Sequence, residues 1–122
     1  MPRIFIVDDD RLVRTLLKAQ LQKGGYEVEA FDSAEHVSKA MDDASPDLLI
    51  TDIFMPERSG LELIMETRGK HPDLKIIAIS GDSQGAHEEG LAVAECLGSV
   101  KTLEKPFTNE AVLKAVEESL QQ

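Results

Sequence analysis

The sequence is short of several features, and each shortage excludes a class of protein. It contains one cysteine, Cys96, so no disulfide can form within the chain. No apolar run approaches the ~18 residues needed to cross a bilayer. The N-terminal Met1-Pro2-Arg3 leads directly into a strand-like run, which is not how a signal peptide begins. We therefore expect a cytoplasmic protein that does not enter a membrane.

Basic residues are fewer than acidic residues. Thirteen Lys and Arg stand against 23 Asp and Glu, which gives a formal net charge of −10. Because contacts to nucleic-acid phosphates need Lys and Arg, a chain this acidic is not expected to bind nucleic acid by itself. The composition is that of a soluble globular protein. The chain has no internal repeat, low-complexity tract or linker, so we expect one domain over residues 1–122.

Apolar, strand-like runs alternate with segments of helical periodicity. The runs that begin at Ile4, Leu48 and Ile76 are continuously apolar, as strands buried on both faces are. The run Tyr26–Ala30 alternates apolar and acidic residues, which indicates a half-exposed strand at a sheet edge. A weaker run from Val100 to Leu103 completes five expected strands.

Five helices are expected after these strands, each marked by apolar residues three or four positions apart. The inward residues are predicted to be Val13, Leu16, Leu17 and Leu21; Val37, Ala40, Met41 and Ala44; Leu61, Ile64 and Met65; Leu91, Ala94 and Leu97; and Val112, Ala115, Val116 and Leu120. The helix within Gly81–Gly98 is expected to be the most mobile, because glycines weaken its start.

Capping signals predict where the helices begin and end. The expected starts are Asp32 with Glu35, Ser59 with Glu62, and Thr108 or Asn109; the expected ends are Gly24-Gly25, a break at Pro46, and Gly69 with Pro72.

This strict alternation requires a parallel sheet with right-handed crossovers and helices on both faces. With the Tyr26–Ala30 strand at an edge, the favoured strand order is 2-1-3-4-5. The fold class is therefore α/β, a doubly wound, flavodoxin-like (βα)5 domain. Its ligand crevice is expected at the switch point between strands 1 and 3.

Polar side chains stand where the expected strands end. Asp8–Asp10 follow the first strand, Asp52 ends the third, Ser80 ends the fourth and Lys105 follows the fifth. Because the ends of parallel strands lie side by side, these groups should converge at one edge of the sheet. Carboxylates, a hydroxyl and an ammonium together suit a hard cation and a phosphoryl group.

Four motifs at these positions resemble the receiver domains of two-component response regulators, and the resemblance covers essentially the whole chain. The motifs are Ile6-Val7-Asp8-Asp9-Asp10 with Arg14 downstream, Thr51-Asp52-Ile53-Phe54-Met55-Pro56 with Gly60, Ile79-Ser80-Gly81, and Glu104-Lys105-Pro106-Phe107. Each motif is weak alone, but the four in this order and spacing are very specific.

The resemblance implies a Mg²⁺ site formed by Asp8, Asp9, Asp52 and the backbone carbonyl of Phe54. Asp9 would bind directly, and Asp8 largely through water. Mg²⁺ takes oxygen ligands and keeps several waters, so two or three carboxylates suffice. The cation would neutralise carboxylates that otherwise repel an anionic phosphoryl group.

The resemblance also implies that Asp52 accepts a phosphoryl group from the phosphohistidine of a sensor histidine kinase or phosphotransfer protein. Ser80 would donate a hydrogen bond to one phosphoryl oxygen, and Lys105 would pair with another. The acyl phosphate would itself be the signal. The chain would then be a signalling domain with self-phosphorylation and slow autodephosphorylation only, and not a turnover enzyme.

The output of such a domain is a conformational change read by a protein partner or an output domain. In many receivers an aromatic residue three positions before the Lys moves inward on phosphorylation, but Thr102 stands at that position here. We therefore expect the signal to pass through the Gly81–Leu103 region and the last helix. Phe54 is expected to shield the phosphoryl group from water, whereas Asp82 has an effect of undecided sign.

Two other functions fit part of the pattern. A phosphatase resembling the haloacid dehalogenases would use Asp8 as its nucleophile, but no acidic pair follows Lys105 and Asp52 would have no task. A pseudo-receiver would bind partners without being phosphorylated. The presence of the complete acidic set, Asp8, Asp9 and Asp52, argues against this alternative. The remaining polar candidates have structural explanations, as surface residues (His36, His71 and His87) or as a small buried residue (Cys96).

Overall fold

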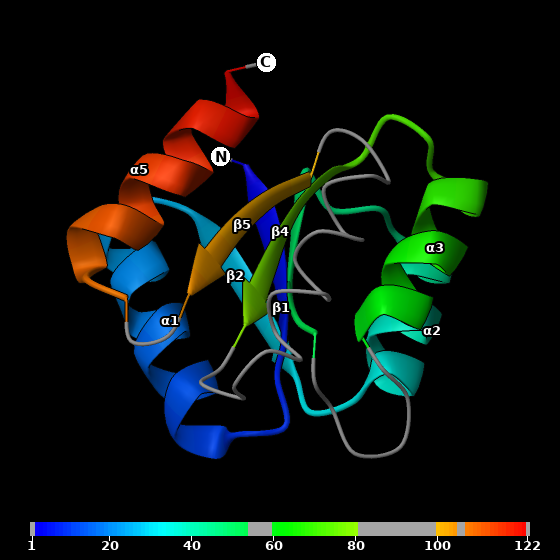
Figure 1. The fold of residues 1–122 in the computed structure, drawn as a ribbon, viewed down its shortest axis with the longest axis horizontal. Coiled ribbons are helices and arrows are strands. Elements are labelled where there is room, and N and C mark those ends of the chain that lie inside the picture. Colours follow the sequence, from blue (N-terminus) through cyan, green and yellow to red (C-terminus); the bar gives the residue numbers. More distant parts are fainter. Residues whose placement is uncertain (1, 54–59, 81–99, 105–106, 122) are drawn as a thin grey trace.

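The computed structural model of the chain describes residues 2–53, 60–80, 100–104 and 107–121. Within these ranges lie nine elements (Figure 1). They are β1 (Arg3–Val7), α1 (Arg11–Lys23), β2 (Glu27–Phe31), α2 (Ala34–Asp43), β3 (Leu48–Asp52), α3 (Gly60–Lys70), β4 (Lys75–Ser80), β5 (Val100–Glu104) and α5 (Asn109–Leu120). The helix expected within Gly81–Gly98 lies outside the described residues.

The five strands form one parallel sheet in the order β2-β1-β3-β4-β5, which confirms the predicted topology. The alternating strand β2 lies at an edge, as its half-exposed pattern predicts. Every side chain of β3, the central strand, is buried. The continuous apolar runs are therefore the strands covered on both faces, and the fold is flavodoxin-like α/β.

Helices cover both faces of the sheet (Figure 1). On one face α1 and α5 pack against a core that includes Ile4 and Ile6 of β1. On the other face α2 and α3 pack against a core that includes Phe5 and Val7 of the same strand. Because side chains alternate along a strand, β1 contributes to both cores in turn.

Two residues that were predicted to face inward, Leu16 and Met65, are instead exposed. Leu17 and Leu21 of α1 are fully buried, but the side chain of Leu16 is 51% exposed. In α3, Leu63 is fully buried instead of Met65, which is 59% exposed. Successive helical residues lie about 100° apart around the axis, so the rotation of each helix on the sheet decides which apolar residues near the edge of its inward face are buried.

Other predicted inward residues are placed as follows. Val37, Met41, Ile64, Val112, Ala115 and Val116 are buried as predicted, whereas Val13, Ala40 and Leu120 are partly buried. Ala44 was predicted to face inward, but it is the exposed residue that ends α2. The side chain of Leu61 and the predicted residues Leu91, Ala94 and Leu97 lie outside the described part of the chain.

The helix ends agree with most of the capping signals. Gly24 ends α1, and Gly25 follows with a φ of 96°, which a residue with a side chain rarely adopts. Thr108 caps α5, because its side chain accepts a hydrogen bond from the amide of Ala111. Helix α3 continues through Gly69 and ends at Lys70, before Pro72. Ser59, the predicted start of α3, is outside the described residues.

The start of α2 corrects a prediction. Its cap is Ser33, whose hydroxyl accepts the amide N–H of His36 at 3.2 Å, and not Asp32. The Asp32 carboxylate instead contacts the imidazole Nδ1 of His36 at 2.7 Å. A serine next to an aspartate offers two capping oxygens, and the path of the chain leaving β2 selects the second.

No helix in the described ranges is long and apolar enough to span a membrane.

Candidate phosphoryl and cation site

The site lies at the carboxyl edge of the sheet, where β1 and β3 end. Val7 of β1 pairs with Thr51 of β3, so the next residues, Asp8 and Asp52, lie level with each other. The chain turns to opposite faces after these two strands, which makes this edge the switch point of the fold. The register alone thus brings two carboxylates together from residues more than forty positions apart.

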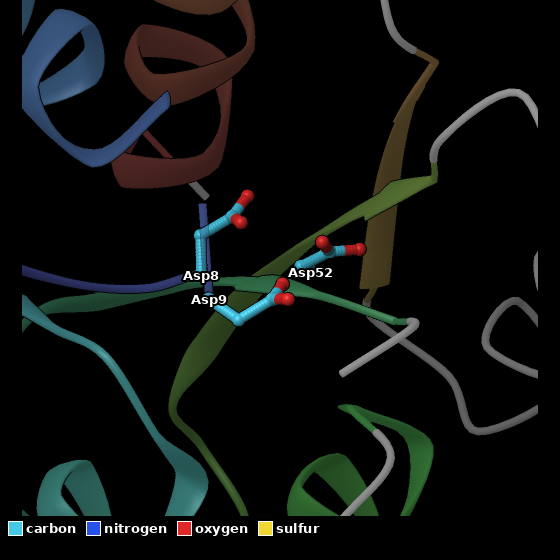
Figure 2. Close-up of side chains that lie close together, drawn as sticks. All are labelled: Asp8, Asp9 and Asp52. Atoms are coloured by element: carbon cyan, nitrogen blue, oxygen red, sulfur yellow. The ribbon is translucent and has the colours of Figure 1, made fainter. Parts of the chain in front are cut away.

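Three carboxylates gather at this point (Figure 2). One oxygen from each of Asp8, Asp9 and Asp52 lies within 4.8 Å of the others. Asp8 and Asp52 are buried, with 1% and 4% of their surfaces exposed, whereas Asp9 is exposed. Ionised carboxylates this close repel one another, and burial strengthens the repulsion. A small, hard cation with oxygen ligands would relieve it, so the donor set fits Mg²⁺.

Hydrogen bonds in the turn between β1 and α1 fix the direction of Asp8. The amide of Asp10 donates to Asp8 Oδ1 at 2.8 Å, and the amide of Leu12 donates to Asp10 Oδ1 at 2.9 Å. Asp10 is therefore the cap of α1 and not a member of the carboxylate cluster. The third aspartate of the run has the structural role that acids at helix starts commonly have.

The end of β3 is held by close backbone contacts. The amide of Ile53 donates to the carbonyl of Ile79 at 2.9 Å, and the amide of Gly60 donates to the carbonyl of Ile53 at 2.7 Å. A Cβ added at Gly60 would lie 1.9 Å from the carbonyl oxygen of Asp52. Only glycine permits this approach, so the first residue of α3 helps to fix the backbone that carries Asp52.

The other predicted site residues are placed only in part. The backbone of Ser80 ends β4, next to β3, and pairs with Glu104 of β5 at the same edge of the sheet. The side chain of Ser80 is not among the described groups. Phe54, Lys105 and Asp82 lie outside the described residues. Thr102, which replaces the usual aromatic residue, is a partly exposed residue of β5.

The histidines were predicted to be surface residues. His36 is exposed, and His71 is partly exposed, with its Nδ1 3.1 Å from Ser45 Oγ. His87 is outside the described residues, as is Cys96. Neither described histidine belongs to the carboxylate cluster.

One feature of the site was not assigned a role from the sequence. Arg14, three residues into α1 from its start at Arg11, donates a hydrogen bond from Nη1 to the backbone carbonyl of Asp8 at 2.8 Å. Its charge also helps to lower the pKa of Asp32, although the main cause of that lowering is the hydrogen bond with His36. The position of Arg14 in the first turn of α1 was a usable signal, because long helical side chains point back toward the helix start.

Comparison with known proteins agrees with this geometry. The response regulator receiver domain family matches residues 4–117. The chemotaxis protein CheY of Listeria monocytogenes is 35% identical, in a match that covers 98% of each chain. The transcriptional regulator NtrC of Azospirillum brasilense is 36% identical over 96% of this chain, but the match spans only 24% of that relative. The chain thus has the length of some relatives and about a quarter of the length of others.

A solved structure supports the same assignment. The receiver domain of NtrX from Brucella abortus superposes with a TM-score of 0.90 at 30% identity, and the match covers 98% of both chains. The family match covers nearly all of the chain, and its site residues lie at the switch point of the fold. The chain therefore belongs to the family of response regulator receiver domains.

Proposed function

We propose that Asp52 accepts a phosphoryl group in a Mg²⁺-dependent reaction, and that the resulting acyl phosphate is a signal. The observation that carries this proposal is the position of the Asp52 carboxylate within 4.8 Å of those of Asp8 and Asp9 at the switch point. Asp52 is nearly buried there, at the end of the central strand. Because backbone hydrogen bonds fix the end of β3, the Asp52 carboxylate has a fixed direction from which it can attack phosphorus in line with the bond that breaks.

Asp8, Asp9 and Asp52 would hold the cation, together with the backbone carbonyl of Phe54. A bound Mg²⁺ supplies charge neutralisation and orients the phosphoryl oxygens. The exposed position of Asp9 leaves room for water ligands, which Mg²⁺ usually keeps.

In the transfer step, an oxygen of the Asp52 carboxylate attacks phosphorus. The phosphorus–nitrogen bond of the donor phosphohistidine breaks, and the nitrogen keeps the electron pair and takes up a proton. Ser80 would donate a hydrogen bond to one phosphoryl oxygen, and Lys105 would balance the charge on another. The intermediate is covalent, and its slow hydrolysis ends the signal.

The proposed donor is a sensor histidine kinase or a phosphotransfer protein of the cytoplasm. The proposed output is a protein partner or an output domain, reached through the Gly81–Leu103 region and the last helix. Residues 1–122 would act as one phosphoacceptor domain with no turnover of an external substrate. Phe54 would slow the attack of water on the acyl phosphate by covering it.

The test is to incubate the protein with acetyl phosphate and Mg²⁺, trap the acyl phosphate with borohydride, and map the label by mass spectrometry. The label should lie on Asp52, and Asp52→Asn should abolish it. Asp10→Asn is a matched control, because asparagine also caps helices well and Asp10 is outside the carboxylate cluster.

Two results would refute the proposal. A label on Asp8 would assign the chain to the phosphatase class, with Asp8 as nucleophile. The absence of label from every aspartate, in a protein that is folded and supplied with Mg²⁺, would make it a pseudo-receiver.

A further inference from the structure

Arg14 donates two hydrogen bonds to the turn between β1 and α1, which contains Asp8 and Asp9 of the acidic cluster. Its backbone amide donates to the carbonyl of Asp10 at 3.0 Å, which is the first hydrogen bond of α1. Its guanidinium reaches back and donates from Nη1 to the carbonyl of Asp8 at 2.8 Å, in a partly buried position. The second bond joins a helix side chain to the backbone of a residue that we assign to the cation site.

The carbonyl of Asp8 belongs to the peptide unit that joins Asp8 to Asp9. Because a peptide unit is planar, holding its oxygen also sets the direction in which the chain enters Asp9. On the other side of Asp8, its amide donates to the carbonyl of Phe31 in β2 at 3.2 Å. The Asp8 carboxylate is held by the amide of Asp10 at 2.8 Å. The backbone of Asp8 is thus fastened at both of its polar groups.

We propose that Arg14 is a positioning residue for the cation site, because it fixes the Asp8–Asp9 peptide and thereby the direction of both carboxylates. The inference rests on the function proposed above and adds a residue to it. Groups that orient metal ligands without touching the metal commonly alter affinity strongly when they are removed.

Simple electrostatics predicts the opposite effect for the loss of Arg14. A guanidinium beside a cation site repels the cation, so removal of its charge should strengthen Mg²⁺ binding. A positioning role predicts weaker binding, because the carboxylates lose their fixed direction. The sign of the change therefore distinguishes the two effects.

The experiment compares Arg14→Met with Arg11→Met by calorimetric titration with Mg²⁺ at constant ionic strength. Both variants remove one positive charge from the first turn of α1, but of these two arginines only Arg14 has a described hydrogen bond to Asp8. We expect Arg14→Met to bind Mg²⁺ about tenfold more weakly than the wild type. Arg11→Met should bind it as tightly or slightly more tightly.

The possible outcomes separate the two proposals. If the wild type binds Mg²⁺ and Arg14→Met binds it equally or more tightly, the positioning role is wrong while the proposed function stands. A lower melting temperature with unchanged Mg²⁺ affinity would make Arg14 a structural residue only, which also overturns the inference. If the wild type binds no Mg²⁺, the proposed function and this inference are both wrong.

A measurement on the wild type keeps the inference testable if Arg14→Met does not fold. A guanidinium that donates to a fixed carbonyl rotates slowly, so the Nη protons of Arg14 should give separate NMR signals at low temperature. These signals should shift when Mg²⁺ is added. Fully averaged signals that do not respond to Mg²⁺ would contradict the positioning role.

Discussion

At the scale of single residues, Gly60 is the described glycine with the least room for a side chain. A Cβ there would overlap the carbonyl oxygen of Asp52 and lie 2.7 Å from the Cα of Ile53. Both neighbours are backbone atoms of a buried strand end, so neither can move aside easily. We expect Gly60→Ala to destabilise the fold by about 2 kcal/mol, as overpacking commonly does.

Gly69 provides the matched control for this prediction. It also lies in α3, but a Cβ there would meet no atom within 4 Å. Because alanine favours helix over glycine, Gly69→Ala should stabilise the protein by up to about 1 kcal/mol. Urea denaturation of both variants measures the effect. Equal effects of the two substitutions would show that the contact at Asp52 is not tight.

Asp32 allows a prediction about pH. The hydrogen bond with His36 lowers the pKa of Asp32 below its ordinary value of 3.8. A lowered pKa in the folded state means that the contribution to stability is complete above about pH 4 and is lost as the pH falls through the folded-state pKa. We expect the carboxyl carbon of Asp32 to titrate below 3.8 by NMR. His36→Ala should move the pKa upward, and an unchanged titration would contradict this contact.

At the scale of elements, substitutions in helix α1 can test which of its faces packs against the sheet. Leu17 is fully buried and Leu16 is 51% exposed, although both fit the helical pattern. Leu17→Ala should cost about 2–5 kcal/mol of stability, as large-to-small core substitutions do. Leu16→Ala should change stability by less than about 0.5 kcal/mol. Chemical denaturation measures both, and a reversed order would mean that α1 is rotated about its axis.

The elements also show what could be predicted from the sequence and what could not. The strand order could be predicted because the run at Leu48 is continuously apolar, whereas the run at Tyr26 alternates apolar and acidic residues. A strand buried on both faces needs apolar residues at every position, and a strand buried on one face needs them only at every second position. The sequence pattern does not show which of Leu16 and Leu17 is buried. That choice depends on the angle at which a helix meets the sheet, which is a tertiary quantity.

The candidate site was predictable to a similar depth. Asp8, Asp9 and Asp52 could be brought together from strand ends alone, because parallel strands finish at one edge. That Asp10 caps α1, and that Arg14 holds Asp8, depends on hydrogen bonds in one tight turn. The run of three aspartates does not show which of them caps the helix and which belong to the carboxylate cluster.

At the scale of the whole molecule, a cation bound in the acidic cluster would link metal binding to stability. Asp8, Asp9 and Asp52 repel one another, and a cation held among them removes that repulsion only in the folded state. At ten times its dissociation constant, a ligand of the native state adds about 1.4 kcal/mol. We expect the melting temperature to rise with Mg²⁺ at constant ionic strength.

Asp9→Asn is the informative variant for this response. It should largely abolish the Mg²⁺-dependent rise and should itself raise the melting temperature without the cation, because one repelling charge is removed. A wild-type melting temperature that is flat across the Mg²⁺ titration would count against the cation site.

Asp9 is the exposed carboxylate of the site in a chain of net charge −10, and this has a kinetic consequence. A small anionic donor such as acetyl phosphate approaches against the field of the protein. Salt shortens the reach of that field from about 30 Å at 0.01 M to about 8 Å at 0.15 M. With Mg²⁺ saturating throughout, added salt should therefore speed phosphorylation by acetyl phosphate. A donor protein with a basic surface would show the reverse, losing speed as salt is added, so that the sign of one salt dependence separates the two kinds of donor.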